Sequence, residues 1–121
     1  MMTSKLDQLK AMTVIVADTG DMEAIRTFKP TDCTTNPTLV LKAADLPAYE
    51  GVIADAISWG KKQSGTKEAV ITAVADRLAV AFGTELARLV PGRVSTEVDA
   101  DLSFDTKASV EKARAIIKAY D

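Results

Sequence analysis

Apolar residues along this chain follow two spacings, one typical of strands and one typical of helices. Three short runs rich in β-branched residues, at 13–17, 33–35 and 93–99, predict strands. Between and after them the apolar residues recur every three or four positions, which predicts amphipathic helices. The order is a helix, then strand–helix, strand–helix–helix and strand–helix. This alternation is typical of α/β proteins with a parallel sheet.

Residues suited to begin helices stand where the helical patterns start. They are Ser4 with Asp7, Asp21, Asn36 with Pro37, Thr66, and Asp105 or Thr106. We expect the first helix to be an N-terminal cover. The near-continuous apolar run at 13–17 predicts a strand buried on both faces of the sheet.

Composition and charge limit the class of protein. At 121 residues and 47% hydrophobic content, we expect a single domain, 1–121, with a core of ordinary size. The net charge of −2, without a long run of either sign, gives no attraction to nucleic acid or to an anionic membrane. Because no apolar run has the length of a membrane span and the N-terminus lacks a signal-peptide core, we expect a cytoplasmic protein. Its expected partners are small molecules or proteins.

Two residue types that usually carry catalysis are scarce. The chain has no histidine, and Cys33 is its single cysteine. These counts exclude disulfides within the chain, multi-cysteine metal sites, Ser-His-Asp and Cys-His catalysis, and the usual zinc sites. Catalysis must therefore use carboxylates or lysine, and we expect Cys33 to be a packing residue.

Polar side chains lie at or near the carboxyl ends of the predicted strands. Asp18 follows the first strand, Thr34 and Asn36 share a face of the second, and Glu97 lies in the third. Ligands of parallel α/β folds bind at this edge, where an Asp and a Glu could divide acid and base roles. The alternative is that each carboxylate only caps the following helix and that Asn36 does the same.

The triplet Asp18-Thr19-Gly20 matches the catalytic signature of aspartic proteases. A chain of about this length could supply half of a dimeric enzyme of the retroviral type. Those proteases are almost wholly β, whereas most apolar positions here keep helical spacing. The pattern of the whole chain therefore argues against a protease.

Three longer stretches carry a family resemblance. VADTGD at 16–21, TDCTTNPTL at 31–39 and VPGRVSTEVDADLSFDT at 90–106 together closely resemble transaldolase, in the same order and with similar spacing. The resemblance covers essentially all 121 residues, but only about the first third of the family's chain. It implies the first three βα units of a TIM-type (α/β)8 barrel, which is a partial barrel with parallel strands and predominantly helical content.

The resemblance also implies an activity and its residues. That family moves a dihydroxyacetone unit between sugar phosphates in the pentose phosphate pathway, through a lysine Schiff base and without cofactor or metal. By its motifs, Asp18 would handle the substrate hydroxyl proton during carbon–carbon cleavage and formation. Glu97 would act through a water during Schiff base formation and hydrolysis. Asn36 would hold a hydroxyl of the dihydroxyacetone unit, and Thr34 would line the same pocket.

One element of the family's chemistry has no counterpart in this sequence. The family's Schiff base lysine lies on the fourth strand, which would begin after Asp121, and none of the ten lysines here falls on a predicted strand. We therefore expect the N-terminal portion of a transaldolase, inactive alone. Two alternatives stay open: a non-enzymatic short protein that binds a partner or a sugar phosphate with the same partial fold, and an unrelated small enzyme that uses Asp18 and Glu97.

Three strands cannot close a barrel that needs eight. Such a piece would present two open edges, and its inner face would leave Val14 and Val16 without cover. We therefore expect a homo-oligomer, formed by edge pairing, by packing of inner faces, or by helix exchange at Ser64-Gly65 or Pro91-Gly92.

Overall fold

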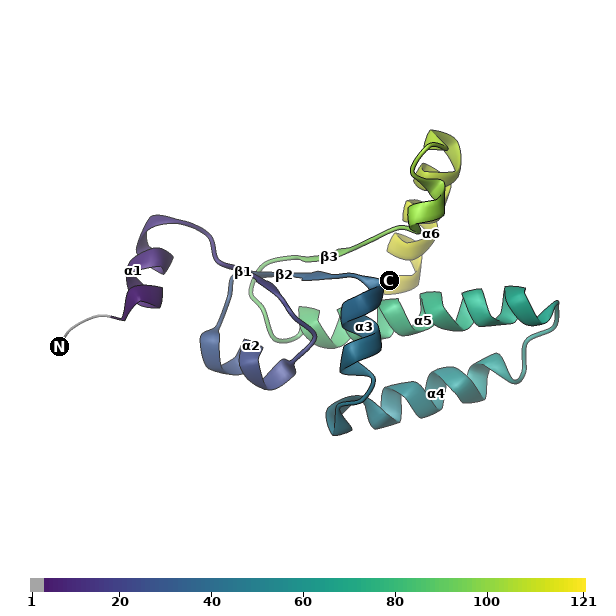
Figure 1. Cartoon of the computed structure of the whole chain (residues 1–121), viewed down its shortest axis with the longest axis horizontal. Helices are drawn as coiled ribbons and strands as arrows, with labels where there is room; N and C mark the ends of the chain where they lie inside the picture. The colour runs from purple at the N-terminus through teal and green to yellow at the C-terminus, as the bar shows by residue number, and fades with distance from the viewer. Residues whose placement is uncertain (1–3) are drawn as a thin grey trace.

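The structure, a computed structural model, describes residues 4–121. Three strands alternate with helices, as the hydrophobic pattern predicts, but three helices rather than two follow the second strand (Figure 1). The strands are β1 (Val16–Asp18), β2 (Asp32–Thr35) and β3 (Val94–Thr96). The helices are α1 (Lys5–Met12), α2 (Met22–Phe28), α3 (Pro37–Ala43), α4 (Glu50–Gly60), α5 (Lys67–Ala87) and α6 (Thr106–Tyr120), with 3-10 turns η1 (Pro47–Tyr49) and η2 (Ala100–Leu102).

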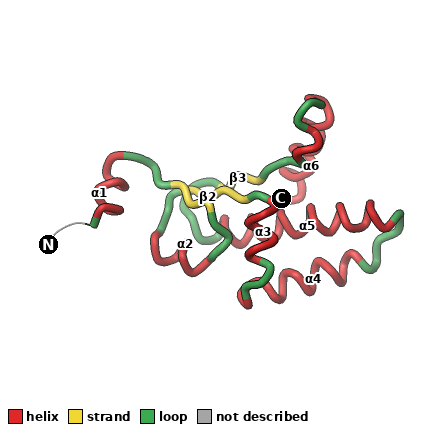
Figure 2. Tube along the Cα trace, in the orientation of Figure 1, coloured by secondary structure: helices red, strands yellow, loops and turns green. Residues whose placement is uncertain are grey.

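The three strands form one parallel sheet in the order β1-β2-β3. Val16 lies opposite Asp32, Asp18 lies opposite Thr34, and Thr34 lies opposite Ser95. Helical segments make up most of the trace, and the strands are short (Figure 2). The predicted fold class, an open parallel α/β piece with predominantly helical content, is confirmed.

All three strands differ from the predicted ranges, β2 only by beginning one residue earlier, at Asp32. The strand predicted over 93–99 ends at Thr96, and the one predicted over 13–17 begins at Val16 and ends at Asp18. Both pair with β2, which has only four residues. Alternation in the sequence marks an extended backbone, whereas a strand exists only where a neighbour supplies hydrogen bonds.

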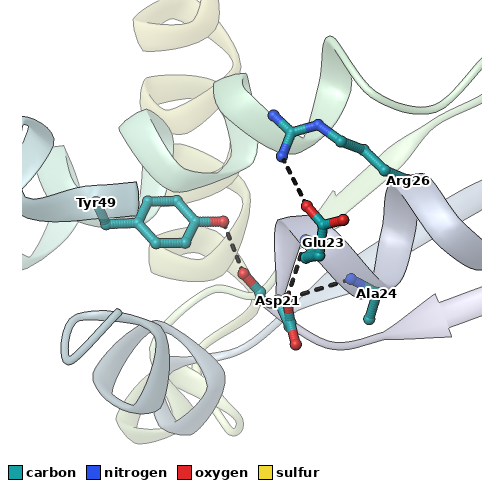
Figure 3. Close-up of polar contacts among 6 residues, drawn as sticks. Asp21, Glu23, Ala24, Arg26 and Tyr49 are labelled. Atoms are coloured by element: carbon teal, nitrogen blue, oxygen red, sulfur yellow. Dashed lines mark hydrogen bonds and ion pairs between the residues drawn. The ribbon is translucent and has the colours of Figure 1, made fainter. Parts of the chain in front are cut away.

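The predicted helix starts are confirmed. Ser4 and Asp7 form a capping box, in which the Asp7 N–H donates to Ser4 Oγ at 3.0 Å. At α2, Asp21 Oδ1 accepts the N–H groups of Glu23 and Ala24 (Figure 3). Thr66 and Asp105 cap α5 and α6 in the same way. Each cap satisfies backbone donors that the first turn of a helix leaves unpaired.

The core lies between one face of the sheet and helices α2, α3 and α5. Tyr49, the last residue of η1 and directly before α4, is completely buried and stacks on Phe82 of α5, with ring centroids 4.0 Å apart. Its hydroxyl donates to the Gly20 carbonyl at 2.7 Å, so this residue links α5 to the β1–α2 turn. Cys33 is also fully buried, which confirms that it is a packing residue.

The opposite face of the sheet is open. Val14 is 58% exposed and Val16 is 51% exposed, so the strand predicted to be buried on both faces is covered on one. The predicted exposure of these two valines in a partial barrel is confirmed. The first helix does not act as a cover, because α1 buries no residue and Met12 is 74% exposed. Figure 1 shows α1 standing apart from the other helices.

The longest helix described is α5, with 21 residues. It lies beside α4, and Figure 1 shows the two running side by side below the sheet. Among residues 4–121, no helix combines the length and the apolar character that crossing a membrane requires.

Candidate active site

Polar side chains from all three strands form a row at the carboxyl end of the open face. Asp18, Thr34 and Ser95 are in register across β1, β2 and β3. Thr34 Oγ1 donates a hydrogen bond of 2.7 Å to Asp18 Oδ1. The structure therefore brings together two of the residues that the sequence predicts for the site. Ser95 completes the row, and its alternation with Glu97 was the signal that places it on this face.

The turn after β1 fixes the position of Asp18. The chain bends at Gly20, where an added Cβ would come within 2.7 Å of the Ala43 Cβ. The Gly20 carbonyl accepts the Tyr49 hydroxyl, and Asp21 begins α2 directly afterwards. Because both sides of this turn are packed, Asp18 projects from a rigid element rather than from a loose loop.

Asn36 and Glu97 belong to a second group. Both line a cavity of about 250 Å3 between the ends of β2 and β3 and helices α3, α5 and α6. Asn36 Oδ1 accepts the Leu39 N–H at 2.9 Å, which leaves its amide nitrogen as the donor for a ligand oxygen. Asp18 and Thr34 lie outside this cavity. The four predicted residues thus form two pairs on neighbouring parts of the same sheet edge.

Of Asp18, Asn36 and Glu97, which could each simply cap a helix, only Asn36 does so. Asn36 does cap α3. Asp18 does not cap α2, because Asp21 does, and Glu97 does not cap α6, because Asp105 does. Helix capping therefore does not explain the two carboxylates.

The structure describes all ten lysines of the chain, and none of them lies on a strand. Lys112 of α6 is the most buried of those in ion pairs, with an 18% exposed side chain between Asp76 at 2.5 Å and Asp99 at 3.1 Å. Burial lowers the pKa of Lys112, but its hydrogen bonds to Asp76 and Asp99 outweigh that effect and raise the pKa. The Lys112 amine is bound to two carboxylates and lies on a helix rather than a strand, unlike the free amine that a Schiff base requires.

No metal centre accompanies these groups in the described part of the chain. Within residues 4–121, no cluster of three or more His, Cys, Asp or Glu side chains could hold a metal ion. The side chains at this edge can transfer protons, through the carboxylates, and form hydrogen bonds, through Thr, Ser and Asn.

A parallel βα repeat with polar groups at the carboxyl ends of its strands is the arrangement of α/β enzymes. The family model described as transaldolase/fructose-6-phosphate aldolase matches residues 15–121, which include all three strands and all four predicted site residues. The chain belongs to this family. Its helical α/β fold also rules out the aspartic protease reading of residues 18–20.

The similar proteins are transaldolases. The transaldolase of Rhizobium rhizogenes is 68% identical over 119 residues, which are 98% of this chain and 37% of that protein. The transaldolase of Agrobacterium fabrum is 64% identical over the same shares of both chains. Transaldolase A of Escherichia coli is 56% identical over 117 residues, or 97% of this chain and 37% of its own length. The chain thus spans little more than a third of these relatives, their N-terminal portion, which confirms the extent of the resemblance.

Proposed function

We propose that this chain is the N-terminal part of a transaldolase that transfers a dihydroxyacetone unit between sugar phosphates through a lysine Schiff base. The observation that carries the proposal is the 2.7 Å hydrogen bond from Thr34 to Asp18 at the carboxyl edge of a parallel sheet. Family membership and the transaldolases among its relatives support it.

The geometry supports a division of roles. Thr34 occupies Asp18 Oδ1, which leaves Oδ2 to take the proton of a substrate hydroxyl while the adjacent carbon–carbon bond breaks. In the reverse direction the same carboxyl returns the proton. The amide nitrogen of Asn36 would donate to a hydroxyl of the three-carbon unit. Glu97, exposed beside the same cavity, would activate the water that forms and hydrolyses the Schiff base.

In this proposal the chain is inactive by itself. Its lysines lie on helices or beside them, so the nucleophile must come from a further part of the polypeptide or from another chain. The substrates would be sugar phosphates of the pentose phosphate pathway, and the protein would work in the cytoplasm without cofactor or metal.

A fused protein tests this proposal. This chain replaces the matched 119 residues of the Rhizobium rhizogenes transaldolase, giving what we call the fused protein. We expect the fused protein to convert fructose 6-phosphate and an aldose phosphate acceptor, because the 68% identity preserves the packing between the two parts. The isolated chain should show no turnover, and borohydride treatment with fructose 6-phosphate should leave its mass unchanged.

The natural Rhizobium rhizogenes enzyme is the positive control in both assays. A three-carbon adduct on a lysine of the isolated chain would contradict its inactivity. A fused protein that is folded by circular dichroism yet inactive would contradict the family activity. If the fused protein were inactive and the isolated chain bound a sugar phosphate, the chain would instead be a non-enzymatic protein that binds sugar phosphates.

We also propose that the isolated chain associates with itself. Its sheet ends at β1 on one side and β3 on the other, and the exposed Val14 and Val16 lie beside the open face. Light scattering over an about tenfold concentration range should therefore give a mass above that of one chain. A single-chain mass throughout, without binding of a hydrophobic dye, would contradict self-association.

A further inference from the structure

The side chain of Glu97 has no support of its own in the described residues. Within residues 4–121 no hydrogen bond or ion pair holds it, and it lies in the irregular segment that follows β3. We call residues 97–99 the Glu97 segment. A carboxylate that must act on one water needs a fixed position, because small misplacements of a reacting group cost much of its effect. The residues on either side of this segment must therefore determine where Glu97 points.

After Glu97, the segment is tied to α6 by an ion pair. Asp99 Oδ2 lies 3.1 Å from Lys112 Nζ, and the same nitrogen lies 2.5 Å from Asp76 Oδ2 on α5. The largely buried ammonium thus joins three elements at one point. Hydrogen bonds to the two carboxylates outweigh the effect of burial and raise the pKa of Lys112, so the ammonium stays charged at neutral pH.

Before Glu97, a second contact reaches the same helix. The hydroxyls of Thr96 and Tyr120 lie 2.5 Å apart, which joins the last residue of β3 to the last turn of α6. Tyr120 fits there because position 83 of α5 is glycine, where an added Cβ would overlap the Tyr120 hydroxyl. Tyr120 thus holds the chain before Glu97, and Lys112 holds it after Glu97. We call these two contacts the anchors.

The lengths of the two elements agree. Lys112 and Tyr120 are eight residues apart, which is about 12 Å along a helix. From Thr96 to Asp99 the chain advances three residues, at most about 11 Å when extended. The two spans are of similar size, so the side chains of Lys112 and Tyr120 can reach Asp99 and Thr96 from one helix.

Polar contacts help to attach α6, beside a half-buried apolar side that includes Ala113 and Ile116. This helix buries no residue completely, and its apolar Val110 and Ile117 are 45% and 63% exposed. Two of its polar contacts reach Thr96 and Asp99, on either side of Glu97.

We propose that Lys112 and Tyr120 are positioning residues, which clamp the Glu97 segment to α6 and aim Glu97 at the cavity that it shares with Asn36. This inference rests on the proposed function of Glu97. It adds two residues, distant from Glu97 in the sequence, that act on the reaction only through Glu97.

The fused protein gives the kinetic test. Lys112→Met and Tyr120→Phe are each expected to lower kcat about 10- to 100-fold, with KM changed less than about threefold. Lys112→Arg keeps the charge and should recover most of the loss. Lys118→Met removes an exposed lysine from the same helix and should leave both constants unchanged.

A double-mutant cycle separates positioning from general stabilisation. If Lys112 acts only through Glu97, Lys112→Met should have no further effect on kcat once Glu97→Gln is present. An equal loss in both backgrounds, or no loss in the single variant, would overturn the positioning role. If Glu97→Gln alone left kcat unchanged, the failure would be that of the proposed function of Glu97.

The isolated chain offers a measurement without catalysis. Amide hydrogen exchange at residues 97–99 should become about tenfold faster in Lys112→Met and in Tyr120→Phe, and stay unchanged in Lys118→Met. Tyr120→Phe removes a single hydroxyl, so it carries the test if Lys112→Met fails to fold. Unchanged exchange at the Glu97 segment in Tyr120→Phe would contradict the clamp.

Discussion

Asp18→Asn in the fused protein is expected to lower kcat by about 10²- to 10⁴-fold, the range typical of a lost acid or base group. Asn keeps the shape of the side chain and can still accept the hydrogen bond from Thr34. It cannot take up or return a proton, so bond cleavage loses its base while substrate binding is largely kept. Steady-state kinetics with fructose 6-phosphate measures the change, and KM should move much less than kcat.

The matched control is Asp21→Asn, three residues further along the chain, at the start of α2. Asp21 caps α2, and Asn is an equally good cap, so this variant should keep full activity. Asp18→Asn should also shift the stability of the isolated chain by no more than about 1 kcal/mol, measured from urea midpoints. A loss of kcat below about threefold for Asp18→Asn would remove Asp18 from the proposed proton transfer.

Tyr49→Ala is expected to destabilise the isolated chain by about 3–5 kcal/mol, the cost typical of truncating a buried aromatic residue. The ring is completely buried and stacks on Phe82 at an interplanar angle of 21°. Such a loss is comparable to the total stability of a small domain. Urea denaturation followed by circular dichroism should therefore show a folded fraction strongly reduced even without denaturant.

Tyr49→Phe separates the hydroxyl from the ring. It keeps the packing but leaves the buried Gly20 carbonyl without its donor, at a cost of about 1–3 kcal/mol. Burial, with smaller contributions from Glu85 and Asp21, raises the pKa of Tyr49 to about 12. The neutral hydroxyl should thus stabilise the fold fully below pH 10, and this contribution should disappear as the pH rises through 12. Tyr49→Phe should lack that alkaline loss, and the same loss in both proteins would assign it to another group.

Local chemistry explains why the sequence predicted the helix starts so well. Asp21, Thr66 and Asp105 each accept N–H groups two or three residues ahead, so the whole contact lies within one short stretch of sequence. The proximity of Asp18 and Thr34 could also be predicted from the sequence. It needs only parallel strands and a period of two, both of which the hydrophobic pattern indicates.

Contacts between segments far apart in the sequence could not be predicted in this way. Lys112 meets Asp76, which is 36 residues earlier, and nothing in the spacing of α5 or α6 indicates which charged side chains face each other. The exposure of α1 has the same cause. Leu9 and Met12 form an apolar stripe of helical period, but such a pattern does not specify what the stripe packs against, and here they remain exposed.

The order of strands in the sheet bears on how the chain acquires its fold during synthesis. Each strand pairs with the one that precedes it in the chain, β2 with β1 and β3 with β2. A ribosome releases the chain from its N-terminus at about 5–20 residues per second, far more slowly than local structure forms. Each strand can therefore pair with the edge of the preceding strand as it emerges. No strand in this sheet needs a partner that is synthesised later.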